Sequence, residues 1–79
     1  MSMMGRIEAA TDRSRDNLLR LADVRARTCM SRATIYRKIA AGSFPASTPI
    51  SAGLVAWYES DIDRWIANPM GWRAVEYVR

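Results

Sequence analysis

The segment Ser31–Gly42 constrains the fold most, because it carries both a start and a stop signal for a helix. Ser31 is a favourable N-cap, since its hydroxyl can accept a hydrogen bond from a free backbone N–H of the first turn. Gly42 stands where the chain must leave the helix, in the left-handed conformation that glycine reaches at little cost. Ile35 and Ile39 lie four residues apart and therefore on one side. The segment predicts a short helix that these two isoleucines anchor to a core.

The opposite side of this helix has the composition of a groove-binding surface. On a helical wheel of about 100° per residue, the residues away from Ile35 are Ala33, Thr34, Tyr36, Arg37 and Ala40. Small residues permit close approach, while a guanidinium and a hydroxyl can donate to base edges or phosphates. We interpret the segment as a DNA recognition helix. An ordinary amphipathic surface helix with solvated Arg and Lys is the alternative for the segment taken alone.

The distribution of charge indicates an anionic partner. The chain has 79 residues, enough for one small domain and a tail, and its 49% hydrophobic and 25% charged residues are typical of a globular protein. The net charge is +4. Between Arg13 and Lys38, eight basic residues against two acidic ones give +6, which leaves −2 for the rest. The positive charge is therefore concentrated around the proposed recognition helix.

The composition argues against an enzyme. The chain has no His, so imidazole catalysis and a His-ligated metal are excluded. Asp61 and Asp63 are better explained as charges at a helix start, and no cofactor is expected. The single cysteine, Cys29, cannot form an intrachain disulfide and is expected to be a small packed hydrophobe in a reducing cytoplasm. Without a signal-peptide pattern or an apolar run of about 18 residues, we expect a soluble cytoplasmic protein with no membrane contact.

The segments before the recognition helix predict a helix-turn-helix. Residues 1–17 read as a flexible arm, or alternatively as a basic arm that lies along phosphates through Arg6, Arg13 and Arg15. Residues 18–21 form an apolar strand or lead-in. A first helix is expected from about residue 22 to residue 28, and residues 29–31 form a turn. The residues expected to face inward are Leu21, Val24 and Ala26, and those expected near the DNA backbone are Arg25 and Arg27.

The segments after the recognition helix predict a wing and a closing helix. Phe44 is expected in the core, and Pro45 forces an extended path. Residues 48–51 and 54–58 predict a β-hairpin around Ala52–Gly53, with Trp57 in the core. A last helix is expected from residue 59 to residue 67, capped by Ser60 or Asp61. It should close the core with an apolar stripe made of Ile62, Trp65 and Ile66.

The predicted fold is therefore mainly α with a small β-hairpin, a winged helix-turn-helix over residues 18–67. Residues 68–79 form a tail in which Trp72, Val75 and Val78 share helical spacing. A short terminal helix there would pack onto the domain or contact another protein. These two possibilities stay open at this point.

An ordered series of motifs carries a family resemblance. The motifs are LRLADV at residues 19–24, MSRATIYR at 30–37, GSFP at 42–45, VAW at 55–57 and DIDRWI at 61–66. In this order they resemble the AlpA-type phage regulators and the excisionases of similar fold, small winged-helix proteins distantly like the MerR DNA-binding domain. The resemblance implies sequence-specific DNA binding on a mobile element, in a nucleoid-associated bacterial or phage protein.

One departure from the family pattern concerns the wing. Family members usually carry a basic residue at the wing tip, where this chain has Gly53. Backbone N–H groups of Ala52 and Gly53, with the Ser51 hydroxyl, can still reach a phosphate. We expect a weaker wing contribution and more reliance on the recognition helix and the N-terminal arm.

The leading hypothesis is an excisionase, a recombination directionality factor that binds and bends attachment-site DNA so that an integrase excises the element. An AlpA-type transcription regulator is the first alternative, and a protein-interaction adaptor docking through Trp72 and Tyr77 is the second. The expected partners are double-stranded DNA, further copies of the chain bound cooperatively, and a tyrosine integrase. The predicted DNA-binding residues are Arg25, Arg27, Ser31, Arg32, Ala33, Thr34, Tyr36, Arg37, Lys38, Ser51 and Gly53.

Overall fold

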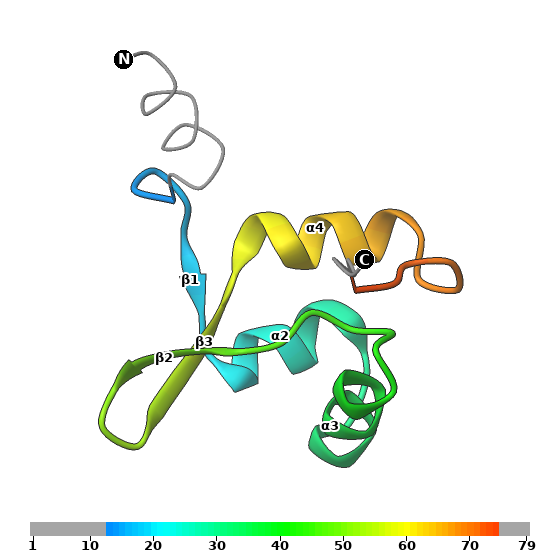
Figure 1. Cartoon of the computed structure of the whole chain (residues 1–79), viewed down its shortest axis with the longest axis horizontal. Coiled ribbons are helices and arrows are strands. Elements are labelled where there is room, and N and C mark those ends of the chain that lie inside the picture. The colour runs from blue at the N-terminus through cyan, green and yellow to red at the C-terminus, as the bar shows by residue number, and fades with distance from the viewer. Residues whose placement is uncertain (1–12, 75–79) are drawn as a thin grey trace, which may run out of the picture.

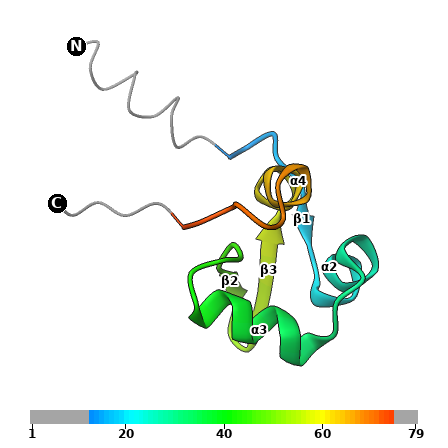
Figure 2. The ribbon, with the colours of Figure 1, turned by 90° about the vertical axis from the view of Figure 1, so that its right-hand side faces the viewer.

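A computed structural model describes residues 13–74, in which three helices pack around a small antiparallel sheet (Figures 1 and 2). The elements are β1 (Leu18–Leu19), α2 (Leu21–Thr28), α3 (Arg32–Ala40), β2 (Thr48–Ser51), β3 (Leu54–Tyr58) and α4 (Glu59–Ala67). The sheet has the order β1-β3-β2. Figure 1 shows α4 along one end of the molecule and α3 at the other, with the β2–β3 hairpin projecting to the side. The winged helix-turn-helix fold is thereby confirmed.

The predicted hairpin is present and is joined by a third strand. β1 pairs antiparallel with β3 through Leu18 opposite Tyr58 and Leu19 opposite Trp57, so the predicted lead-in is a short strand. The turn between β2 and β3 uses Gly53 at φ +76°, a conformation that suits glycine. The predicted wing, made of β2 and β3, is therefore part of a three-stranded sheet.

The turn between α2 and α3 begins with a left-handed residue. Cys29 is the C-cap of α2 with φ 63°, and its N–H donates to the carbonyl of Arg25. The Cys29 side chain is exposed, so the prediction that it packs as a small hydrophobe is wrong. The left-handed backbone of Cys29 ends α2, and in this conformation the thiol points into solvent. Ala26 is also exposed, contrary to prediction, while Val24 is buried as expected.

One apolar cluster unites the elements. The buried members are Val24, Ile35, Phe44, Trp57, Ile62 and Trp65. Two of them also tie down the loop after α3: Trp57 Nε1 donates to the Pro45 carbonyl at 3.0 Å, and Trp65 Nε1 donates to the Ser43 carbonyl at 2.9 Å. The Phe44 ring lies edge-on to Trp65, with ring centroids 5.0 Å apart. The loop that connects α3 to the sheet is therefore held at fixed points.

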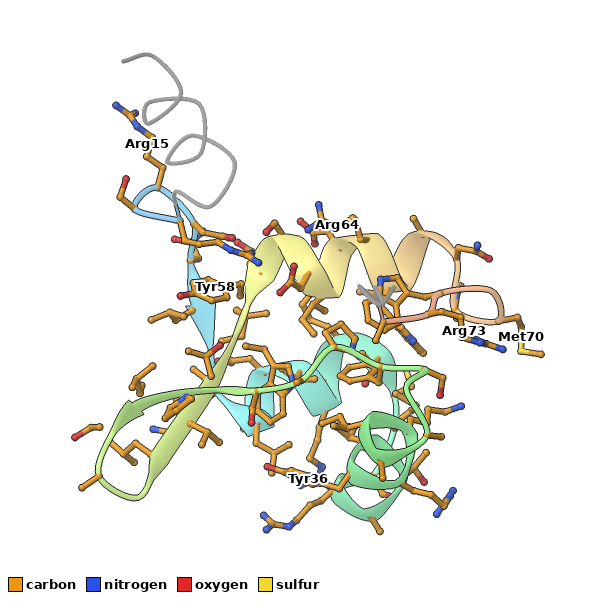
Figure 3. All side chains as sticks on the ribbon, viewed as in Figure 1. Arg15, Tyr36, Tyr58, Arg64, Met70 and Arg73 are labelled. Carbon is orange, nitrogen blue, oxygen red and sulfur yellow. The ribbon has the colours of Figure 1, made fainter. Side chains whose placement is uncertain are left out.

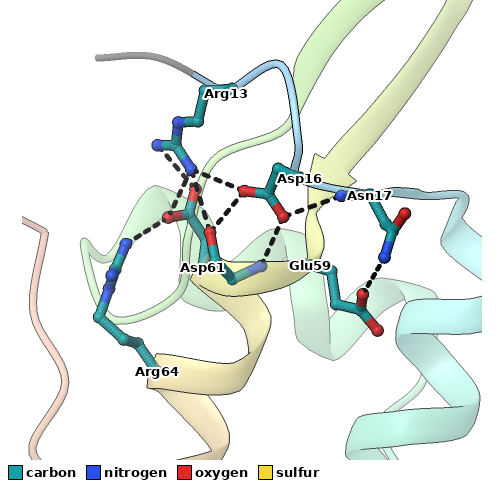
Figure 4. A network of polar contacts seen from close by, with 7 residues as sticks. Arg13, Asp16, Asn17, Glu59, Asp61 and Arg64 are labelled. Atoms are coloured by element: carbon teal, nitrogen blue, oxygen red, sulfur yellow. Dashed lines mark hydrogen bonds and ion pairs between the residues drawn. The ribbon is translucent and has the colours of Figure 1, made fainter. Parts of the chain in front are cut away.

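The start of α4 is capped from a distant part of the chain. The N-cap is Tyr58, which makes no side-chain cap hydrogen bond, so the prediction of Ser60 or Asp61 is wrong. The carboxylate of Asp16 takes this role, accepting from the Ser60 N–H at 3.2 Å and from the Ser60 hydroxyl at 2.6 Å (Figure 4). Arg13 adds an ion pair to Asp61 at 3.3 Å. Residues 13–17 of the predicted arm thus lie against α4, whereas residues 1–12 are outside the described part.

The segment after α4 returns to the end of α3. Trp72 is half-buried against the core cluster, and the Ala74 N–H donates to the Gly42 carbonyl at 2.9 Å. Residues 72–74 are not helical, and the predicted positions Val75 and Val78 lie outside the described residues. Among residues 13–74, no helix has the length and apolar character needed to cross a membrane.

The remote cap gives a pH-dependent prediction. The Ser60 hydroxyl donates to Asp16 and, with the backbone N–H groups of Ser60 and Asn17 and the Arg13 guanidinium, lowers the pKa of this carboxyl below its ordinary value of 3.8, although partial desolvation opposes the shift. A lowered pKa stabilises the fold above the ordinary value, and this contribution disappears as the pH falls through the lowered pKa. Asp16→Ala should therefore lower the midpoint of thermal unfolding at pH 7, and the deficit should shrink as the pH falls below 3.8.

The matched control is Asp63→Ala, which removes a carboxylate of α4 that is 56% exposed and pairs with Arg27. Exposed ion pairs contribute little to stability, so this variant should unfold close to the native midpoint. Equal midpoints for the two variants at pH 7 would contradict the capping role of Asp16.

Candidate nucleic-acid interface

The start and end of α3 follow the predicted signals. The Thr34 N–H donates to Ser31 Oγ at 3.2 Å, which is the expected N-cap bond. Gly42 has φ +77° just after the helix, and its N–H donates to the Ile39 carbonyl at 3.0 Å. Ile35 is buried, and Ile39 packs partly buried against the same cluster. These contacts fix which face of α3 points outward.

The outward face of α3 carries positive charge and small side chains. Arg32, Ala33, Arg37 and Ala40 are exposed, and α3 contains no acidic residue. Arg37 Nη2 donates to Thr34 Oγ1 at 3.4 Å, while Thr34 Oγ1 also accepts from Ser31 Oγ at 3.1 Å. The exposed guanidinium of Arg37 is therefore oriented by the Thr34 hydroxyl, which the N-cap hydroxyl of Ser31 holds in turn. This part of the predicted surface is brought together as expected.

Tyr36 supports Arg32 from the side of the core. The Arg32 Cζ atom lies 5.1 Å from the centroid of the Tyr36 ring, within the range of a cation–π contact. The Tyr36 ring in turn meets Trp57 edge-on, with centroids 6.2 Å apart and planes at 65°. Figure 3 shows Tyr36 on the side of α3 that faces the hairpin. Tyr36 is thus half-buried, and it links the recognition helix to the sheet.

The basic residues of α2 lie in different surroundings. Arg25 is exposed and lines a shallow open hollow beside Ser31, where the N-terminus of α3 begins. Arg27 is held by α4, with Nη1 at 2.8 Å from Asp63 Oδ1 and 3.9 Å from Glu59 Oε2. The structure therefore brings Arg25, but not Arg27, to the α3 surface. Lys38 is half-buried in the last turn of α3.

The wing tip lies on the same side of the molecule as α3. Both views of the ribbon place the β2–β3 turn and α3 on the side of the molecule away from α4, and Figure 1 shows them apart from each other along the longest axis (Figures 1 and 2). Ser51 and Gly53 are exposed at this tip, and a side chain built at Gly53 would meet no atom within 4 Å. Recognition helix and wing can therefore face one ligand.

Two features were missed in the sequence. Ile50 and Leu54 are 42% and 39% exposed at the wing, and no motif singled them out. The available indication was the absence of any charged residue from position 39 to position 58.

Arg13, which the sequence placed in a possible DNA-binding arm, pairs with Asp16 and Asp61, and its Cζ atom lies 4.2 Å from the centroid of the Tyr58 ring. No local pattern reveals partners that are more than forty positions away.

The fold and the exposed basic helix define a winged helix-turn-helix protein of the DNA-binding class. The chain belongs to the AlpA family of phage regulators: the family model described as "Prophage CP4-57 regulatory protein (AlpA)" matches residues 17–70. It is also 32% identical over 66 residues to "Uncharacterized protein ORF88" of Enterobacteria phage P4, which covers 84% of this chain and 75% of that protein. No solved structure matches the chain. The match confirms the predicted resemblance, and the AlpA family is one of DNA-binding regulators.

The N-cap of α3 gives a stability prediction. Ser31→Ala removes the acceptor for the Thr34 N–H and should lower the free energy of unfolding by about 1 kcal/mol. Ser31→Asp restores a cap acceptor and adds a negative charge at the positive end of the helix dipole, so its stability should stay close to native. Urea unfolding of both variants measures the difference. If Ser31→Asp were as unstable as Ser31→Ala, the serine would not act as a cap.

Proposed function

We propose that the outward face of α3 enters the major groove of a specific DNA site. The observation that supports this most directly is the pair of exposed guanidiniums, Arg32 and Arg37, each held by a neighbouring side chain. A positioned guanidinium can make a bidentate contact to the O6 and N7 atoms of a guanine. Ala33 and Ala40 leave room for the helix to approach the bases.

The remaining contacts would position the helix on the backbone. Ser31 and Arg25 lie together where the first N–H groups of α3 point outward, and helix N-termini of this kind favour phosphates. Lys38 is a point charge for a phosphate near the other end of α3. Ser51 and Gly53 would reach the backbone from the wing. Arg27 would have to leave Asp63 before it could contact DNA, so we leave it out of the proposed DNA contacts.

We further propose that this binding serves excision of a mobile element. A single small winged domain covers limited DNA, so useful affinity calls for several copies side by side. Adjacent copies that bend the duplex would bring the arms of an attachment site to a tyrosine integrase. The second candidate is control of a promoter, which the family description as a regulatory protein favours. An adaptor that docks through Trp72 is less favoured, because this ring packs against the core.

The recognition helix gives a paired prediction. Arg37→Ala should lower affinity for the specific site by roughly 1–3 kcal/mol while leaving binding to random DNA nearly unchanged, because a base contact is lost. Lys38→Ala should weaken binding to all sequences alike and reduce the slope of log affinity against log salt by about 1. Fluorescence anisotropy over a series of salt concentrations measures both effects.

The control is Arg64→Ala, which removes an exposed guanidinium from α4, at the opposite end of the molecule from α3 (Figure 3). It should bind the specific site with native affinity. An Arg37→Ala variant that binds the specific site as tightly as the native chain would refute the assignment of this face.

The two biological uses are separated by a paired assay in cells. Excision of the element is measured with its integrase, and output of the neighbouring promoter is measured with a reporter, for native and Arg37→Ala chains. As an excisionase the native chain should raise excision, and Arg37→Ala should abolish the increase. Altered promoter output without any change in excision would leave the regulator as the function.

A further inference from the structure

The wing is built without charge. From Ile39 to Tyr58 the sequence contains no Asp, Glu, Lys or Arg, and this run includes both strands of the hairpin and its turn. At its outer part, Ile50 and Leu54 are 42% and 39% exposed. With no cation on the wing to pair with a phosphate, these two side chains offer an apolar contact.

A bulge sets the position of one of these side chains. The register of β2 and β3 passes from Pro49 opposite Val55 to Ser51 opposite Leu54, which leaves Ile50 as the extra residue of β2. Such a bulge bends its strand and re-aims the side chain at the irregular position. Ile50 therefore directly precedes the residue that pairs with Leu54, and both aliphatic side chains are exposed.

The surroundings of this pair indicate what covers it. The wing tip and α3 both lie on the side of the molecule away from α4, so a duplex that runs along this side and is held by α3 would also pass the wing (Figures 1 and 2). Tyr36 packs against Trp57 and fixes the distance between the two elements. β2 is an edge strand, and Pro49 within it has no N–H to offer to a further strand. These features favour DNA as the occupant over a second copy added at the sheet edge.

We propose that Ile50 and Leu54 form an apolar wedge that enters the minor groove beside the site held by α3. This inference rests on the proposed function, since it assumes that α3 holds the duplex. Aliphatic side chains in the minor groove contact sugars and base edges, partly unstack a base step and bend the duplex. Flexible pyrimidine–purine steps are the easiest to open in this way. The wing would therefore select deformable DNA and bend it, in place of the ionic contact that a basic wing supplies.

The test compares native protein with the double variant Ile50→Thr/Leu54→Thr on a duplex that carries one binding site. Threonine suits a strand, so the hairpin is kept while its apolar surface is reduced. We expect roughly tenfold weaker binding and a smaller bend in a circular-permutation gel assay, with the salt dependence unchanged, because no phosphate contact is removed. Circular dichroism checks that the variant is folded.

Two further variants sharpen the test. Leu18→Thr makes the same kind of change at a residue of β1 that is 49% exposed and lies outside the wing, and it should leave both affinity and bend at native values. Ala52→Arg places a cation at the exposed turn and should steepen the salt slope by about 1. With dimethyl sulfate as the probe, the native chain should protect adenine N3 in the minor groove at the wing and guanine N7 at α3. The double variant should lose only the adenine protection.

Three outcomes would overturn the wedge. Native affinity and bend in the double variant would show that the aliphatic pair does not touch DNA. A loss seen only on DNA with several adjacent sites, and not on one site, would make the pair a contact between copies. Native protein that fails to distinguish its site from random DNA would remove the proposed function itself, whereas the first two outcomes leave that function standing.

Discussion

The indole of Trp57 is the contact on which the rest of the structure depends. It is fully buried in the central strand, its backbone lies opposite Leu19 of β1, and its N–H bonds the Pro45 carbonyl. The same ring meets Tyr36 of α3 edge-on. Trp57 therefore links β1 through its backbone, and the loop after α3 and the recognition helix through its ring.

The separation of charges follows from this arrangement. The acidic residues of α4 face the N-terminal segment and α2, where Asp61 pairs with Arg13 and Asp63 pairs with Arg27. α3 itself contains no acidic residue, and the guanidiniums on its outward face are exposed. The carboxylates of α4 are thus held in ion pairs, whereas α3 is basic and the β2–β3 wing carries no charge. The exposed guanidiniums of α3 would attract a polyanion.

The sequence allowed prediction wherever the determining contacts are local. Ser31 and Gly42 delimit α3 because a cap and a left-handed exit act within a few residues, and the period of Ile62 and Trp65 reveals the buried face of α4. Prediction failed where the partner is remote. Asp16 caps α4, which begins more than forty residues later in the chain. The sequence therefore predicted Ser60 as the cap, whereas Ser60 donates hydrogen bonds to the Asp16 carboxylate. The exposure of Cys29 was missed because its backbone, not its side chain, is what the turn requires.

The exposed thiol at the start of the turn also offers a reporter position. Cys29 is the single cysteine of the chain and lies two residues before the N-cap of α3, in the turn between two helices. A thiol-reactive dye or spin label would attach there without any engineered residue. Because Cys29 shares a hollow with Arg25 and Ser31, its signal would report directly on the approach of DNA to the start of α3.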